Sequence, residues 1–88
     1  MKDYEMNGEF ESQQKQVRNY LLKGNSITPL EALHKFGSLR LSALIYNLRW
    51  EEGFPIITEK IQVSPKKRVA KYYIDPKYLE EYNKNLKK

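Results

Sequence analysis

The stretch that decides the fold is residues 28–53, which read TPLEALHKFGSLRLSALIYNLRWEEG. Thr28, Pro29 and Glu31 predict a helix start, because threonine caps a helix, proline fits its first position, and a glutamate three residues after the cap completes a capping box. Gly37 predicts the end of this helix, since glycine adopts the left-handed conformation without strain. The apolar residues between these points predict its buried stripe: Leu30, Leu33 and Phe36.

A second helix is expected over residues 38–50, with Ser38 as its cap. Leu41, Ile45 and Leu48 follow the spacing i, i+4, i+7 and predict a stripe that faces the core. At 100° per residue, the opposite face carries Leu39, Arg40, Ala43, Tyr46 and Asn47, with Ser42 and Arg49 on a flank. Two short helices joined by a tight turn predict a helix-turn-helix.

A β-hairpin is expected directly after this helix pair. Residues 54–63 alternate in the manner of a strand, and residues 69–74 return as its partner. The turn is expected at residues 64–68, because Pro65 cannot sit in a central ladder. Its tip carries three cations: Lys66, Lys67 and Arg68. The order of helix, turn, helix and basic hairpin predicts an α+β fold, a winged helix-turn-helix.

Further helices are expected on both sides of this unit. Ser12 is expected to cap the first helix, and the polar residues 1–11 are expected to form a flexible lead-in. The winged helix-turn-helix then spans 12–75, and residues 76–88 form a C-terminal helix and basic tail. The apolar stripe of that helix could pair with its copy in a homodimer or fold back on the first helix: Tyr78, Leu79, Tyr82 and Leu86.

Charge is distributed unevenly along the 88 residues. Up to Glu59 there are seven Lys or Arg against eight Asp or Glu, a net charge of −1; from Lys60 onward there are nine against three, a net charge of +6. The two parts add up to the net charge of +5. This asymmetry favours a polyanionic partner. The alternative is that lysines at the hairpin aid solubility and discourage edge pairing with other chains.

Several classes of function are not expected. The chain has no cysteine and a single histidine, His34, so thiol chemistry, disulfides and a histidine pair for a metal are excluded. No nucleophile with its base, paired carboxylates or glycine-rich phosphate loop is visible, so no enzyme, cofactor or small-molecule ligand is expected. No apolar run is long enough to span a bilayer, and the start lacks a signal-peptide core, so a cytoplasmic location is expected.

Four blocks of sequence occur in a characteristic order: ITPLEALHKFG from Ile27, LRLSALIYNLR from Leu39, EGFPI from Glu52, and a basic hairpin that closes on VAKYY from Val69. Together they resemble a family of small winged helix-turn-helix proteins of bacteriophages and prophages. The resemblance covers a little over half of the chain. It implies the fold, a phage-type origin in a bacterial host cell, and binding to DNA. Leu44 departs from the family, in which this position is often basic.

On this basis we expect a protein that binds double-stranded DNA, as a small transcriptional regulator or a DNA-architecture factor. The helix over 38–50 would enter the major groove, with Arg40 on a base edge. The hairpin tip would reach the adjacent groove or backbone. The expected contact residues are Ser38, Arg40, Ser42, Ala43, Tyr46, Asn47, Arg49, Lys66, Lys67 and Arg68. Trp50 is expected to be buried. The alternative is an adaptor or inhibitor of phage origin that docks on a protein.

Overall fold

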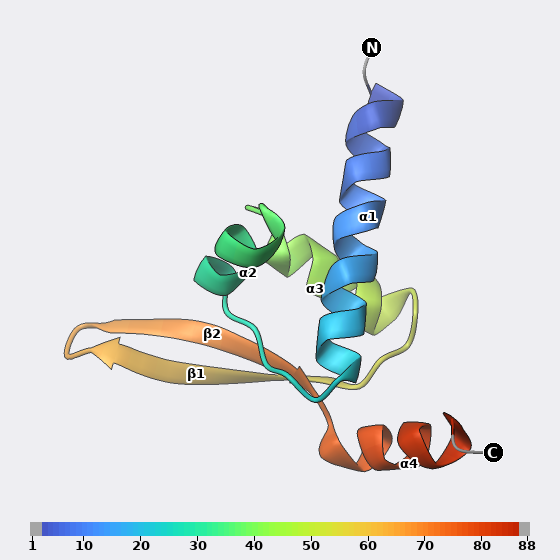
Figure 1. Cartoon of the computed structure of the whole chain (residues 1–88). Coiled ribbons are helices and arrows are strands. Elements are labelled where there is room, and N and C mark those ends of the chain that lie inside the picture. Colours follow the sequence, from blue (N-terminus) through green and yellow to red (C-terminus); the bar gives the residue numbers. More distant parts are fainter. Residues whose placement is uncertain (1–2, 87–88) are drawn as a thin grey trace.

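The computed structural model describes residues 3–86 and contains helices around a small core, with one long hairpin (Figure 1). The elements are α1 (Asp3–Leu22), α2 (Pro29–Phe36), α3 (Leu41–Trp50), β1 (Ile56–Ser64), β2 (Lys67–Ile74) and α4 (Pro76–Leu86). The strands pair antiparallel in a two-stranded sheet. The architecture confirms the predicted α+β class, with three helices, a hairpin and a C-terminal helix.

The first helix begins earlier than the sequence suggested. α1 starts at Asp3, so the prediction that Ser12 caps it is wrong, and the expected lead-in is helical from Asp3 onward. The physical reason is that residues 3–11 include three glutamates and a methionine, which are good helix formers and need no apolar periodicity to form a helix. Apolar periodicity reports burial and not helix formation as such, so its absence did not mark these residues as a helix.

The start and end of α2 follow the prediction. Thr28 Oγ1 accepts a hydrogen bond from the Glu31 N–H at 3.3 Å, and Glu31 Oε1 accepts one from the Thr28 N–H at 3.0 Å. These reciprocal bonds are the predicted capping box. Gly37 ends the helix with φ of +67°, and its N–H donates to the Leu33 carbonyl.

The start of α3 differs from the prediction. Arg40 occupies the cap position and the helix begins at Leu41, so Ser38 does not cap it. Ser38 is buried, with 2% of its surface exposed, and its N–H donates to the Ala32 carbonyl at the end of α2. Its Oγ accepts from the Arg40 N–H at 3.1 Å. Because Ser38 completes the end of α2, the next helix can start only after the turn.

The core confirms the apolar stripe of α3 and corrects that of α2. Leu41, Ile45 and Leu48 are buried, and Leu44 joins them. They pack with other buried residues from α1, the segment before α2, α2 itself and both strands: Val17, Leu21, Ile27, Ala32, Ile56 and Ile74. In α2, however, Leu30 and Leu33 are exposed and Ala32 is buried. α2 therefore meets the core through Ala32 and the half-buried Phe36 of the predicted stripe, and it leaves its leucines outside.

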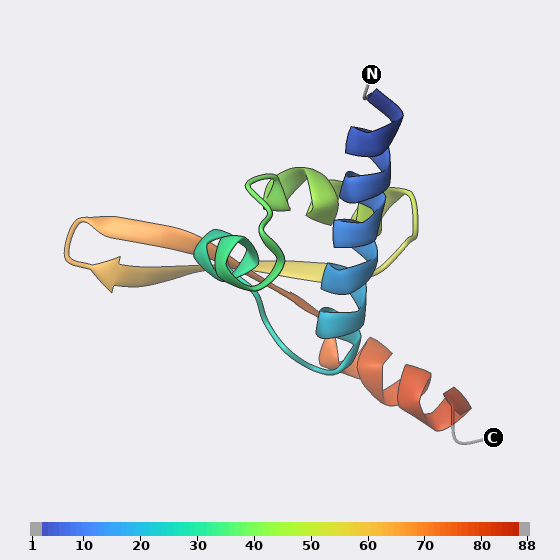
Figure 2. The same ribbon diagram turned by 45° about the horizontal axis from the view of Figure 1, so that its top comes forward.

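The hairpin has a shorter turn than predicted. Only residues 65 and 66 form it, because β1 continues to Ser64 and β2 begins at Lys67. The register pairs Ser64 with Lys67 and Gln62 with Arg68, with an irregularity between Gln62 and Ser64. Both views show the hairpin extending past α2, away from α1 and α4 (Figures 1 and 2).

Two links fix this hairpin to the helices. Ile27 and Tyr72 exchange two backbone hydrogen bonds of 2.9 Å, which join the segment before α2 to β2. Arg49 of α3 donates from Nη2 to the Ile56 carbonyl and to Thr58 Oγ1, each at 2.9 Å. The base of the hairpin therefore has a defined position relative to both helices of the helix-turn-helix.

α4 contacts the body through its first turn. The Tyr78 ring meets Phe54 edge to face at 5.7 Å, and Leu79 also packs against the core. Beyond this turn α4 points away from the body and does not run back along α1, so the structure does not support the alternative in which it folds back on the first helix (Figure 2). The side chain of Leu86, the last member of the predicted stripe, lies outside the described residues.

No helix within residues 3–86 is both long and apolar enough to span a membrane.

Candidate nucleic-acid interface

The outer face of α3 is exposed along its whole length. Ser42, Ala43 and Tyr46 lie on it, with Arg40 exposed at the cap position. Trp50 is 68% exposed, so the prediction that it is buried is wrong. Its position lies about 200° around the helix from Leu48, which places it on the outer face. The rings of Tyr46 and Trp50 form a pair, with centroids 6.5 Å apart.

The three hairpin cations are exposed, but they do not form one cluster at the tip. Lys66 lies in the turn, while Lys67 and Arg68 are consecutive residues of β2. Successive side chains of a strand point to opposite faces, so the side chains of Lys67 and Arg68 lie on opposite sides of the hairpin. Lys67 lies on the side of the helix-turn-helix, where it lines a pocket with Ser42 of α3. The hairpin therefore presents charge beside the start of α3.

Farther from the tip, the hairpin neutralises part of its own charge. Glu59 and Lys71 stand opposite each other in the register, and Lys71 Nζ lies 3.6 Å from Glu59 Oε1. Apart from Lys60 in β1, the other cations of the hairpin lie at its outer end.

The model of a family described as "winged helix-turn-helix domain" matches residues 12–76. The chain belongs to the winged helix-turn-helix family. No curated protein and no solved structure matches the chain significantly. Membership suggests DNA binding in general; by order in the chain, the β1–β2 hairpin occupies the place of the wing in such a domain and α3 the place of the helix called the recognition helix.

Asn47 of the recognition helix has a partner inside the chain. Its Nδ2 donates to Gln14 Oε1 of α1 at 3.2 Å. Gln14 in turn donates to Glu52 Oε2 at 2.7 Å, and Arg18 Nη1 lies 2.8 Å from Glu52 Oε1. This polar network holds the end of α3 against α1. The structure therefore gives Asn47 a positioning role that its spacing on the helix did not indicate.

The predicted site residues separate into two groups. Seven are exposed on the recognition helix, its cap or the wing: Arg40, Ser42, Ala43, Tyr46, Lys66, Lys67 and Arg68. The other three are buried or half-buried, and their hydrogen bonds hold the fold. Ser38 is buried in the turn, Asn47 bonds to α1, and Arg49 holds the base of the wing. The hydrogen bonds of Asn47 and Arg49 join residues distant in the sequence, so no local signal could have revealed them.

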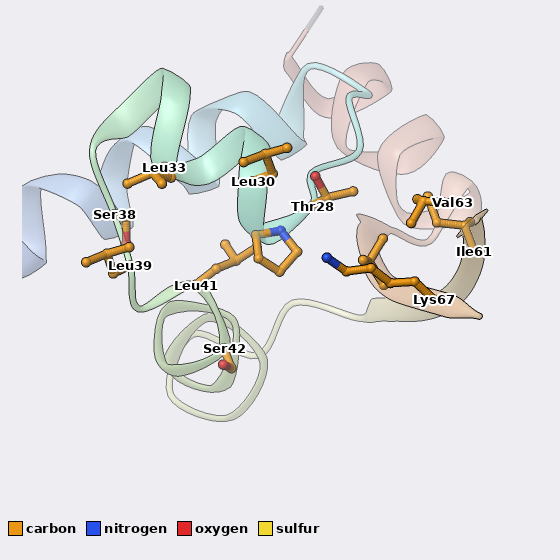
Figure 3. A pocket seen from close by; sticks show the side chains of 12 residues that line it. Thr28, Leu30, Leu33, Ser38, Leu39, Leu41, Ser42, Ile61, Val63 and Lys67 are labelled. Atoms are coloured by element: carbon orange, nitrogen blue, oxygen red, sulfur yellow. The ribbon is translucent and has the colours of Figure 1, made fainter. Parts of the chain in front are cut away.

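Sequence reasoning missed a pocket between the helix-turn-helix and the wing. It has a volume of about 510 Å³. One wall comes from the start of α2, the turn and the start of α3, and the other comes from the hairpin (Figure 3). Most of its lining is aliphatic: Leu30, Leu33, Leu39, Leu41, Ile61, Val63 and Val69, together with Pro29. Thr28, Ser38, Ser42 and Lys67 supply the remaining side chains. The signal in the sequence was a group of three leucines close together, Leu30 and Leu33 in α2 and Leu39 in the turn.

In the part of the chain that the structure describes, no group of three or more histidine, aspartate or glutamate side chains could hold a metal ion.

Proposed function

We propose that this protein binds double-stranded DNA, with α3 in the major groove and the wing on the adjacent groove or backbone. Its main support is the position of the wing beside the start of α3: Ser42 and Lys67, from the two elements, line the same pocket. A duplex that receives α3 would therefore meet the cations of the wing at the same time. Family membership and the net charge of +6 from Lys60 onward support the same conclusion.

The recognition helix would read the DNA through its first turns. Arg40 is assigned to a base edge, because it is exposed at the cap position and a guanidinium can pair bidentately with guanine. Ser42 can donate to a phosphate oxygen. Ala43 lets the helix approach the groove floor closely, and Tyr46, farther along, would reach phosphate or sugar. Ser38, Asn47 and Arg49 are assigned to positioning α3 and the wing.

The wing would supply contacts that do not depend on sequence. Lys66, Lys67 and Arg68 are exposed at its outer end. Because Lys67 and Arg68 point to opposite faces of β2, we assign Lys67 to the phosphates beside α3 and Arg68 to the groove beyond the wing.

We further propose that the protein is a small transcriptional regulator or DNA-architecture factor of a phage or prophage, acting in the cytoplasm of its bacterial host. The phage-type blocks of sequence support this origin. A single module buries little area on DNA, so tight binding would need a dimer or repeated sites. The outward direction of α4 supports a homodimer formed through that helix (Figure 1).

The experiment that tests DNA binding is fluorescence anisotropy with labelled duplexes of varied sequence, titrated with protein at low and at physiological salt. With about 4–6 phosphate contacts, the affinity should fall by orders of magnitude between the two conditions. If no duplex binds at low salt, the proposal is wrong.

The assignment of Arg40 has its own test. Arg40→Ala should weaken binding to the preferred duplex by about 1–3 kcal/mol and relax the preference at one base pair. Lys23→Ala is the matched control, because it removes one exposed cation after the end of α1. Equal losses on every sequence would refute the role of Arg40 as a base reader.

A further inference from the structure

The pocket between the helix-turn-helix and the wing has features that DNA binding does not use. Leu39 is 84% exposed and Leu30 63% exposed, and both line it. Leu33 and Val63 on its walls are exposed as well. An exposed aliphatic cluster of this kind marks a site for a partner or a ligand. A sugar-phosphate backbone offers these side chains only the small apolar surface of its deoxyribose rings, so a molecule with larger apolar groups matches the pocket better.

The charge around the pocket defines the chemistry of that occupant. The side chain of Lys67 reaches from the wing across the pocket toward the start of α2 (Figure 3). Lys66, in the turn at the end of the wing, adds a second exposed cation near it. A matching molecule therefore carries apolar groups for the leucines and carboxylates for the cations. A second copy of this chain does not match well, because two molecules of net charge +5 would meet at their most basic part.

The openness of the pocket favours a protein segment over a small molecule. A pocket for a small molecule normally covers most of the ligand's surface. Here the two most exposed leucines are Leu30 of α2 and Leu39 of the turn, which lie on one wall of the pocket. The wing forms the opposite wall and does not cover them. An amphipathic helix that binds in a groove contacts both walls. Its apolar face packs against the floor of the groove, and its charged side chains lie along the two edges.

We propose that this pocket binds an acidic amphipathic helix of a partner protein, whose aliphatic side chains enter between α2 and the wing and whose carboxylates pair with Lys67. The competition that follows rests on the proposed DNA binding, because a phosphate and a carboxylate at Lys67 would repel each other and take up the same space. Such a partner would therefore displace the protein from DNA.

The test uses a labelled synthetic peptide of about four helical turns, with leucines on one face and glutamates on the flanks, titrated with the full chain. Binding should be saturable. Leu39→Glu and Lys67→Glu should each raise the Kd about tenfold or more, because the first places a carboxylate in the apolar contact and the second reverses the paired charge. Trp50→Glu is the matched control, since Trp50 is an exposed apolar residue that does not line the pocket.

A charge exchange makes the test specific. A peptide with lysines in place of its glutamates should bind wild type poorly and should regain affinity for Lys67→Glu. Circular dichroism of each variant checks that it is folded. The proposal is overturned if the Leu39→Glu or Lys67→Glu variant binds the acidic peptide as wild type does, or if the lysine peptide binds wild type equally well.

Further measurements separate this inference from DNA binding and from self-association. Displacement of a labelled duplex by the acidic peptide is expected if both proposals hold. If no duplex binds, the direct peptide titration still tests whether the pocket binds the acidic helix. Sedimentation of the protein alone should show no association that Leu39→Glu abolishes; such an association would assign the pocket to a second copy and overturn the proposal.

Discussion

The cations of the wing allow a quantitative prediction. Replacing Lys66, Lys67 and Arg68 by alanine together should weaken DNA binding and also make it less sensitive to salt. All three side chains are exposed at the outer end of the hairpin, so the substitution leaves the core intact. A cation that pairs with a phosphate releases condensed counterions, and each such contact contributes about 0.9 to the slope of log affinity against log salt.

The magnitude follows from the number of contacts removed. If each of the three cations meets a phosphate, the slope should become shallower by about 2.7. Over a fourfold rise in salt, wild type should therefore lose about 40-fold more affinity than the triple variant. The same change should appear with every duplex, because phosphate contacts carry no sequence information.

Anisotropy titrations over a salt series measure this slope directly. The matched control is a triple alanine variant at Lys15, Lys23 and Lys84, which are exposed on or next to α1 and α4. Both variants change the net charge from +5 to +2 by removing three cations. The control should keep the wild-type slope. Equal slopes for the two variants would show that only net charge matters, and the assignment of the wing to DNA would be refuted.

Three further predictions concern how the fold positions the interface. Thr28→Ala removes the oxygen that accepts from the Glu31 N–H and should lower the free energy of unfolding in urea by about 1 kcal/mol; an unchanged value would contradict the capping box. Gly37→Ala should cost about 1–2 kcal/mol in the same assay, because φ is +67° and open space around the added methyl leaves backbone strain as the cause. Arg49→Ala removes two hydrogen bonds to β1 and should speed hydrogen exchange at the base of the wing, with a loss of about 1–3 kcal/mol in stability; unchanged exchange there would show that Arg49 does not fix the wing.

The sequence by itself determined the order of elements and several of their ends. The capping box at Thr28, the left-handed Gly37 and the stripe of Leu41, Ile45 and Leu48 are local patterns, because each depends on residues within two turns of one helix. Such patterns need no knowledge of the rest of the chain. They were sufficient for the winged helix-turn-helix fold, which the family match confirms.

The tertiary structure alone decided which side chains face outward and which are used internally. Leu30 and Leu33 follow a helical stripe, yet α2 meets the core through Ala32 and Phe36, since the direction of packing is set by α3 and the strands. Asn47 and Arg49 look like surface residues in the sequence, but α1 and β1 supply their partners from far along the chain. Hydrogen bonds between distant segments form only when the chain folds. The sequence alone therefore could not separate the residues that position the interface from those that would contact DNA.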